Sequence, residues 1–208
     1  MTSHFEPTDS LTGSVAVITG GTGAIGLASA HRLAKLGARC VLLYNSEAPE
    51  SAAAKAAALP GSGHLTFKAQ VTDSASLQAV ADQVAALCGV VHILVNSAGY
   101  TKAVPANDLD ALTDELIDDI LKVNFRGVIA TIRAFMPLLK KSEDGLIVNI
   151  SSIAGFTGTG SNLAYVAAKA SIDVVGDALA KAFAPYVRVI SVSPGVVDST
   201  FVPGRGAD

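Results

Sequence analysis

The amino-acid sequence predicts an α/β fold built on one parallel sheet with helices on both faces. Short, continuously apolar segments alternate with segments of helical period along the chain, as a parallel sheet buried on both faces requires. A glycine-rich turn at residues 20–26 links the first apolar segment to the first helical one, which is typical of sheets that bind nucleotides. We therefore expect a doubly wound, Rossmann-type sheet with strand order 3-2-1-4-5-6.

The six expected strands are short runs rich in valine, isoleucine and leucine, the residues that favour a buried pleated surface. In chain order they are residues 14–19, 40–44, 65–71, 90–95, 146–150 and 187–192. The first ends at the glycine turn, and the last ends shortly before a proline and a glycine. These turn residues mark where each strand stops.

The expected helices have apolar residues at spacings of three and four. They are the segment from the glycine turn to Gly37, residues 52–59, the segment after Asp73, the long region 109–140, and residues 165–183. Gly37 ends the first helix, and Pro60 and Gly61 end the second. Asp73 is expected to cap the third, because its carboxylate can accept hydrogen bonds from the free N–H groups at a helix start.

Length and composition favour a single domain over residues 1–208, with no internal linker or repeat. Half of the residues are hydrophobic and only 16% are charged, which is too apolar for a disordered chain. The net charge of -3 gives no reason to expect nucleic acid or an anionic membrane as a partner. Cys40 and Cys88 lack metal-ligand spacing, so we expect buried free thiols and no metal site. With neither a signal sequence nor an 18-residue apolar segment, we expect a soluble, cytoplasmic protein.

Tyr165 and Lys169 are four residues apart in an expected helix, so they lie on the same face, one turn apart. A nearby ammonium group favours phenolate and lowers the pKa of a tyrosine, which makes the phenol a usable proton donor or acceptor near neutral pH. The pair alone is a weak signal, since a core aromatic residue beside a surface lysine has the same spacing. Its meaning depends on which residues lie nearby.

Several loops of unusual composition follow the expected strands. Ligands of doubly wound sheets bind beyond the carboxyl ends of the strands, so we expect these loops to share one edge. They are residues 20–26, the segment after Tyr44, residues 96–99, Ser151 and Ser152, and residues 193–195. Glycines after the first strand let the backbone approach a pyrophosphate at the N-terminus of the next helix.

Five motifs stand out in the sequence: Thr19-Gly20-x-x-x-Ala24-Ile25-Gly26, Asn96-Ser97-Ala98-Gly99, Asn124, Ser152 thirteen residues before Tyr165, and Pro194-Gly195. Together these motifs resemble the short-chain dehydrogenase/reductase family, and most of all its 3-oxoacyl-thioester (acyl-carrier-protein) reductases. The resemblance covers the chain from about residue 13 to its end. It implies an enzyme that moves a hydride between a nicotinamide cofactor and a carbonyl or alcohol.

The resemblance also implies a role for each catalytic residue. Tyr165 is the general acid in carbonyl reduction, and Lys169 lowers its pKa and binds the nicotinamide ribose. Ser152 orients and polarises the substrate oxygen, where a hydroxyl donor is most useful. Asn124 holds a water in a proton relay that reaches Lys169. Ser151 is the rival of Ser152, but the spacing to Tyr165 favours Ser152.

The same resemblance implies the cofactor-binding residues. They are Gly20, Thr22, Ala24, Ile25, Gly26, Tyr44, Asn45, Ser46, Gln70, Val71, Asn96, Ala98, Gly99, Tyr165, Lys169, Pro194 and Gly195. Three positions depart from the family pattern. Ala24 replaces a glycine, Ser97 replaces an asparagine, and Gln70 stands where an aspartate commonly meets the adenine amino group. Glutamine can accept the same hydrogen bond, so we expect cofactor binding to be retained.

The end of the second strand indicates which cofactor is used. An acidic residue there would bind the ribose diol of NAD and repel a 2'-phosphate. The sequence has Tyr44-Asn45-Ser46 instead, which favours NADP(H). NAD(H) remains possible, because Glu47 is close and Gly23 occupies a loop position that is often basic in NADP users.

The C-terminus is shorter than the family resemblance leads us to expect. Family members continue through a further helix and a final strand, so we expect a C-terminal truncation and an incomplete substrate lid. The substrate pocket is expected to involve residues 100–104, residues 155–162 and the loop after Pro194. The expected helix 165–183 is apolar on most sides, which favours a homodimer or homotetramer.

Two alternatives to an NADPH-dependent ketone reductase stay open. One is an NAD-dependent alcohol, sugar or steroid dehydrogenase, which comparison of NADPH and NADH binding would separate. The other is a nucleotide-binding sensor or scaffold without catalysis. Proteins of that second kind usually lose a catalytic residue, whereas Asn124, Ser152, Tyr165 and Lys169 are all present.

Overall fold

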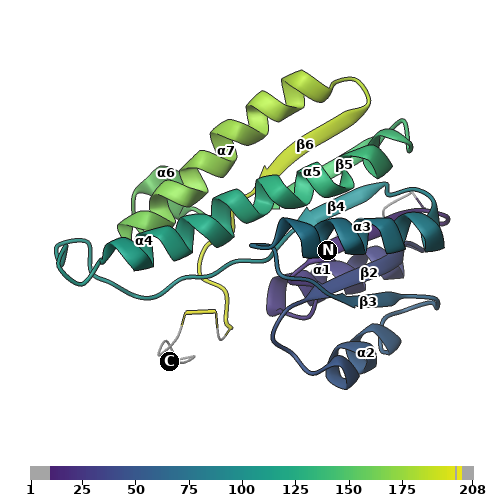
Figure 1. Cartoon of the computed structure of the whole chain (residues 1–208), viewed down its shortest axis with the longest axis horizontal. Coiled ribbons are helices and arrows are strands. Elements are labelled where there is room, and N and C mark those ends of the chain that lie inside the picture. The colour runs from purple at the N-terminus through teal and green to yellow at the C-terminus, as the bar shows by residue number, and fades with distance from the viewer. Residues whose placement is uncertain (1–9, 200, 203–208) are drawn as a thin grey trace, which may run out of the picture.

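The computed structural model describes residues 10–199, 201 and 202 of the chain. One six-stranded sheet runs through it, and every neighbouring pair of strands is parallel (Figure 1). The order is β3-β2-β1-β4-β5-β6, as the sequence predicts. The strands are β1 (Val15–Thr19), β2 (Arg39–Tyr44), β3 (Leu65–Lys68), β4 (Ile93–Asn96), β5 (Gly145–Ile150) and β6 (Val187–Val192). The third strand stops at Lys68, three residues earlier than predicted, because the chain turns where Asp73 N–H donates to the Gln70 carbonyl.

The helices alternate with these strands. They are α1 (Ala24–Lys35), α2 (Pro49–Ala57), α3 (Ser74–Cys88), α4 (Asp114–Leu121), the π-helical turn η1 (Lys122–Arg126), α5 (Gly127–Lys140), α6 (Ala154–Thr157) and α7 (Leu163–Phe183). Asp73 caps α3 as predicted, since its Oδ1 accepts from the N–H groups of Ala75 and Ser76. The long helical region predicted from residue 109 begins only at Asp114, because Thr113 caps α4 through the N–H of Leu116. The sequence did not predict η1 or α6.

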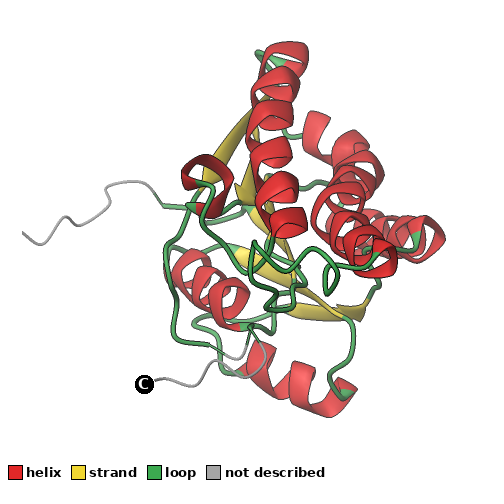
Figure 2. Ribbon diagram, turned by 90° about the vertical axis from the view of Figure 1, so that its left-hand side faces the viewer, coloured by secondary structure: helices red, strands yellow, loops and turns green. Residues whose placement is uncertain are grey.

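The helices cover both faces of the sheet (Figure 2). One core contains Val17, Val41 and Leu94 with apolar residues of α3, α5 and α7. A second core on the opposite face contains Ile18 and Leu42 with alanines of α1 and α2. The central strands are therefore buried on both sides, and the carboxyl ends of the parallel strands lie at one edge.

Two further findings concern residues outside the site. Cys40 is buried and burial raises its pKa to about 11, whereas Cys88 is only partly buried; neither forms a disulfide. Among the residues that the structure describes, no helix is both long and apolar enough to span a membrane.

Candidate active site

Two glycines of the turn after β1, Gly20 and Gly26, lie in contacts that leave no room for a side chain. Gly20 has a φ of +61°, a conformation that favours glycine, and a Cβ there would lie 3.0 Å from the backbone of Ala98. A Cβ on Gly26 would lie 2.2 Å from the Gly20 carbonyl oxygen. Gly23, the N-cap residue of α1, supplies no capping side chain, so the first N–H groups of the helix have no side-chain partner. Free amides at a helix N-terminus fit a pyrophosphate.

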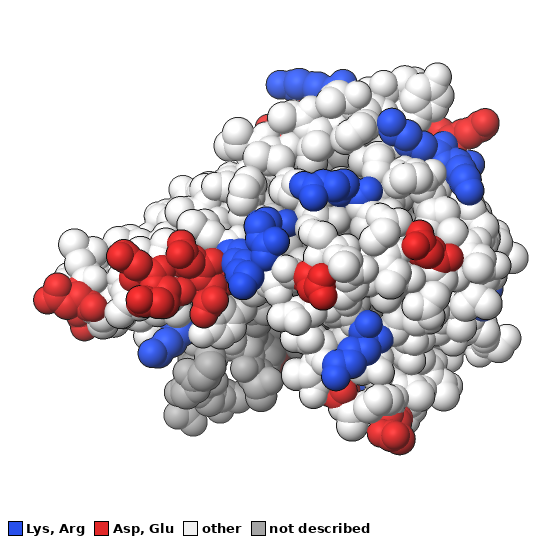
Figure 3. Space-filling model, in the orientation of Figure 1, with Lys and Arg blue, Asp and Glu red and all other residues white. Residues whose placement is uncertain are grey.

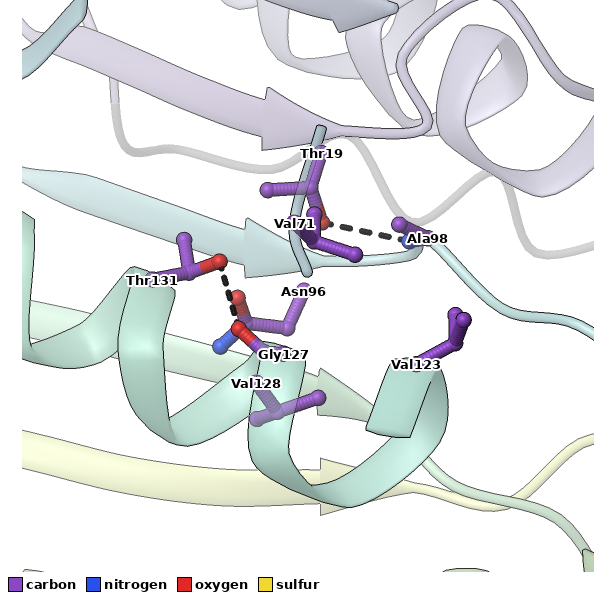
Figure 4. Close-up of a pocket in the computed structure, with 8 residues that line it drawn as sticks. All are labelled: Thr19, Val71, Asn96, Ala98, Val123, Gly127, Val128 and Thr131. Atoms are coloured by element: carbon purple, nitrogen blue, oxygen red, sulfur yellow. Dashed lines mark hydrogen bonds between the residues drawn. The ribbon is translucent and has the colours of Figure 1, made fainter. Parts of the chain in front are cut away.

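Thr19 joins this turn to the loop after β4. Its Oγ1 accepts hydrogen bonds from the N–H groups of Ser97 and Ala98, each at 3.1 Å. Figure 4 shows Thr19 and Ala98 at the rim of a narrow cleft between the ends of β1 and β4 and the helix that begins at Gly127. Thr19 therefore fixes the loop after β4 to the start of the glycine turn, and both segments are predicted to bind the cofactor.

Asn96, at the end of β4, is another of the residues that line this cleft (Figure 4). Its Nδ2 donates to Oδ1 of Asn149 at 2.9 Å and ties β4 to β5. Its own Oδ1 is buried, and no described residue hydrogen-bonds to it. An unpaired buried acceptor is uncommon in folded proteins, so this oxygen is a polar atom of the site that has no partner among the described residues.

Asn124 is fully buried within η1. Its Nδ2 donates to the carbonyl oxygens of Tyr100 at 2.6 Å and Ile120 at 2.9 Å, and its Oδ1 accepts from the Tyr100 N–H at 3.3 Å. The side chain thus fixes the loop that follows β4. These three bonds use both the Nδ2 and the Oδ1 of the amide, and one of them joins Asn124 to the Ile120 carbonyl within the helical segment.

Ser151 and Ser152, at the end of β5, point in different directions. Ser151 is buried, and its Oγ donates to Oδ2 of Asp173 at 2.9 Å. The Oγ of Ser152 accepts from the Ala154 N–H at 3.2 Å, which leaves its own hydrogen free to donate. The nearby Ser152 hydroxyl also acts on Tyr165, since it lowers the pKa of the phenol. Of the two serines, Ser152 is therefore the one beside the tyrosine.

Tyr165 and Lys169 lie one turn apart in α7, as their spacing predicts. Lys169 Nζ lies 5.5 Å from the centre of the Tyr165 ring and donates to the Ile150 carbonyl at 2.6 Å. The N-cap of the helix is Asn162, whose Oδ1 accepts from the Tyr165 N–H at 2.8 Å and whose Nδ2 donates to the Lys102 carbonyl. The sequence analysis missed Asn162, although an asparagine three residues before the tyrosine is a common N-cap signal.

The expected lowering of the Tyr165 pKa by Lys169 is wrong for this structure. Burial raises the pKa of Tyr165, and the Ser152 hydroxyl only opposes that effect. Lys169 is also buried, which lowers its pKa from 10.5 to about 8, against the opposing charge of Asp173. Removal of both groups from water disfavours their charged forms, and burial is the largest cause of both shifts.

The segment after β2 contains a charged pair that the sequence analysis did not anticipate. Asn45 and Ser46 are exposed, whereas Glu47 pairs with Lys55 of α2 at 2.7 Å and accepts a hydrogen bond from Ser51. Lys55 Nζ also donates to the Thr22 carbonyl of the glycine turn at 3.0 Å. The lysine lowers the pKa of Glu47 to about 2. A cation therefore stands between the end of β2 and the glycine turn, eleven residues beyond Tyr44 in the sequence.

The remaining predicted residues lie around this edge. Tyr44 is buried, Gln70 is exposed, and the side chain of Val71 packs against Gly127. The Pro194 carbonyl accepts from the Ile153 N–H at 3.1 Å, which joins the loop after β6 to the loop after β5. Phe201 lies with its ring centre 6.0 Å from that of Tyr165 and packs near Gly99. The predicted loops thus meet around Tyr165 and the glycine turn.

Comparisons with known proteins show the family to which the chain is similar. The sequence model of the short chain dehydrogenase family matches residues 14–207. The chain is 38% identical over 189 residues to D-threitol dehydrogenase of Mycolicibacterium smegmatis, covering 90% of this chain and 71% of the relative. It is 34% identical over 188 residues to 3-oxoacyl-(acyl-carrier-protein) reductase FabG of Escherichia coli, covering 90% of this chain and 75% of the relative.

A solved structure gives the same result. The crystal structure of NAD+-bound xylitol dehydrogenase resembles this chain with a TM-score of 0.81 and 28% identity, covering 90% of this chain and 72% of that one. The fold, the family match and the relatives agree with the resemblance seen in the sequence. The chain therefore belongs to the short-chain dehydrogenase/reductase family of oxidoreductases, whose members act on small molecules with a nicotinamide cofactor.

Proposed function

We propose that the chain reduces the carbonyl group of a small molecule with NADPH, and that 3-oxoacyl thioesters are the closest substrate class. The observation that supports this most is the grouping of Ser152, Tyr165 and Lys169, three residues that come from the loop after β5 and from α7. The relative from Escherichia coli, a 3-oxoacyl-(acyl-carrier-protein) reductase, supports the substrate class. Bound NADPH supplies the hydride, which is chemistry that no side chain can provide.

Each residue of the site then has a defined task. The free hydrogen of the Ser152 hydroxyl donates to the substrate oxygen and stabilises the negative charge that develops there. Tyr165 transfers its proton to that oxygen, so the carbonyl carbon gains a hydride, the oxygen gains a proton, and an alcohol forms. The positive charge of Lys169 compensates the negative charge of the phenolate that remains after Tyr165 gives up its proton. Asn124 fixes the loop at Tyr100, and we propose that it positions a water for proton exchange with Lys169.

A Tyr165→Phe variant tests the assignment. We expect NADPH-dependent turnover to be lost while NADPH still binds, because the ring keeps its packing and only the proton donor is removed. Turnover should be screened with acyl thioesters, ketones and polyols, and NADPH binding by fluorescence titration. A Tyr165→Phe enzyme with near wild-type turnover contradicts the proposal.

The preference for NADPH rests on Lys55. Its ammonium group lies next to the glycine turn at Thr22, where a positive charge suits a 2'-phosphate. Glu47, the acid that could have favoured NAD, is engaged by Lys55 and Ser51. We expect Lys55→Ala to weaken NADPH binding by roughly tenfold and to leave NADH binding almost unchanged. Lys35→Ala, an exposed lysine at the far end of α1, is the matched control.

The second candidate is an NAD-dependent polyol dehydrogenase. The Glu47 carboxylate favours it, because the pair with Lys55 is partly exposed and a ribose diol could replace the lysine. D-threitol dehydrogenase and NAD+-bound xylitol dehydrogenase are among the similar proteins. Tighter binding of NADH than of NADPH, together with polyol oxidation, would select this function.

We also propose a homodimer or homotetramer that pairs through α4, α5 and α7. Leu163 and Val174 of α7 are 40% and 71% exposed, and an apolar helix surface of this kind favours contact with another protein surface. Sedimentation velocity at micromolar concentration checks this proposal. A single monomeric species would contradict it.

A further inference from the structure

Asp173 lies one turn beyond Lys169 in α7, with its carboxylate directed toward the end of β5. Its Oδ2 accepts the hydrogen bond from Ser151 at 2.9 Å. Its Oδ1 is buried, and none of the described residues hydrogen-bonds to it. Gly155 makes room for the group, since a Cβ there would lie 3.1 Å from Oδ2. A carboxylate is thus held in a niche where half of its hydrogen-bonding capacity is unused.

Lys169 is a buried basic group one helical turn before Asp173 in α7, so it is a group on which this carboxylate could act. The lysine is 6% exposed, and its ammonium group donates to the Ile150 carbonyl, which has no net charge. Asp173 forms no direct ion pair with it in the described part of the chain, yet its charge raises the lysine pKa against the effect of burial. An electrostatic effect across a water-poor interior is stronger than the same effect at the surface.

Other charged groups on the elements around α7 are turned to solvent or paired elsewhere. The carboxylates of α4, which are Asp114, Glu115, Asp118 and Asp119, are exposed and gather on the surface over that helix (Figure 3). Lys122 and Arg126 of η1 are exposed, and Arg126 donates to the Thr72 carbonyl. Arg188 of β6 pairs with Asp144 at the surface. Neither α6 nor β5 contains an ionisable side chain, and Tyr165 is the remaining titratable group beside Lys169.

We propose that Asp173 is a positioning residue for Lys169: its carboxylate, oriented by Ser151, keeps the buried ammonium charged and so sets the pH range of proton transfer. The inference rests on the proposed function of the Tyr165 and Lys169 pair. The two neighbouring serines then have different roles: Ser152 acts on the Tyr165 phenol, and Ser151 orients the Asp173 carboxylate. Asp173 itself hydrogen-bonds to Ser151, and no described contact joins it to Tyr165 or Ser152, so it is not a catalytic residue.

The test uses the full chain labelled with 13C at the lysine side chains. The Lys169 signal is the one absent from Lys169→Met, and its titration midpoint is measured by NMR. Asp173→Asn should lower that midpoint by about 1 pH unit or more, because one nearby charge of opposite sign is lost. Ser151→Ala keeps the Asp173 carboxylate but removes the hydrogen bond that orients it, so this variant should lower the Lys169 midpoint by less than Asp173→Asn does. Asp177→Asn, an exposed aspartate one turn further along α7, should leave it unchanged.

The pH profile of turnover gives the second readout. In Asp173→Asn the decline of kcat at high pH should move to lower pH by the same amount, with the KM for NADPH unchanged. A midpoint within 0.3 pH units (roughly twofold in the proton equilibrium) of wild type overturns the inference. A fall in kcat at every pH without a shift also overturns it, since that indicates a structural role. If Asp173→Asn does not fold, the Ser151→Ala midpoint decides in the same way.

Failure of this inference and failure of the proposed function are distinguishable. The NMR midpoint is measured without substrate, so it reports on Asp173 even if wild-type protein reduces no carbonyl compound. Wild-type turnover that depends on Tyr165, together with an unshifted Lys169 midpoint, overturns only the role of Asp173.

Discussion

Replacement of Asn124 by alanine is expected to destabilise the chain through the loop at Tyr100. The asparagine is completely buried, and its amide makes three hydrogen bonds to backbone groups. Alanine would leave two carbonyl oxygens and one N–H group without these partners. A buried hydrogen bond contributes about 1 kcal/mol net, so the three together are worth roughly 3 kcal/mol.

The expected loss can be measured directly. For a domain of this size, about 3 kcal/mol corresponds to a fall in Tm of roughly 10 °C. Urea unfolding followed by circular dichroism gives the free energy of unfolding for both proteins. Thr131→Val is the matched control, since Thr131 is equally buried and its hydroxyl bonds only to Gly127 within its own helix.

We expect Thr131→Val to cost less than about 1 kcal/mol, because the Gly127 carbonyl keeps its helical partner. The reasoning is refuted if Asn124→Ala also costs less than about 1 kcal/mol with an unchanged urea dependence. That result would mean that water or a backbone shift satisfies the Tyr100 and Ile120 groups at little cost. The loop would then be held by other contacts.

Two further predictions concern the glycine turn and the buried lysine. In Gly26→Ala, the new methyl group would lie 2.2 Å from the Gly20 oxygen, so we expect cofactor binding to weaken at least tenfold (about 1.4 kcal/mol). In Gly23→Ala, the nearest contact of the methyl group would be 3.3 Å, so this control should bind the cofactor normally. Fluorescence titration measures both affinities. The folded-state pKa of Lys169, about 8, lies below its ordinary value of 10.5, so between these pH values the unfolded chain binds more protons and stability rises with pH. The unfolding free energy of wild type relative to Lys169→Met should therefore increase by on the order of 3 kcal/mol from pH 8 to pH 10.5 in urea titrations, and a flat difference would contradict the shift.

The sheet was predictable because its signals are local. The β6 bounds match the predicted residues 187–192, and the order of all six strands follows from the apolar runs and the glycine turn. The start of α4 was not predictable to the residue, because apolar spacing continues before Thr113 and only the capping bond fixes the boundary. The π-helical turn η1 could not be predicted, because the spacing of apolar residues does not distinguish it from an α-helix.

The candidate site was predictable as a set of residues but not as an electrostatic arrangement. Spacing brought Tyr165 and Lys169 to one face of α7, whereas the directions of their pKa shifts depend on burial by distant segments. Lys55 was missed because it belongs to the next helix and reaches the glycine turn only through the fold. Charge effects of this kind require the three-dimensional distances between groups.

The two serines after β5 explain how the site counters the effect of burial. Tyr165 and Lys169, the pair proposed to transfer a proton, are both largely removed from water, and burial drives both toward their neutral forms. Each group therefore needs a polar neighbour that opposes this effect. Ser152 stands beside the phenol, while Ser151 fixes the Asp173 carboxylate whose charge favours the ammonium. Two consecutive hydroxyls with different partners thus act on the two members of the pair, so Ser151→Ala should affect Lys169 and Ser152→Ala should affect Tyr165.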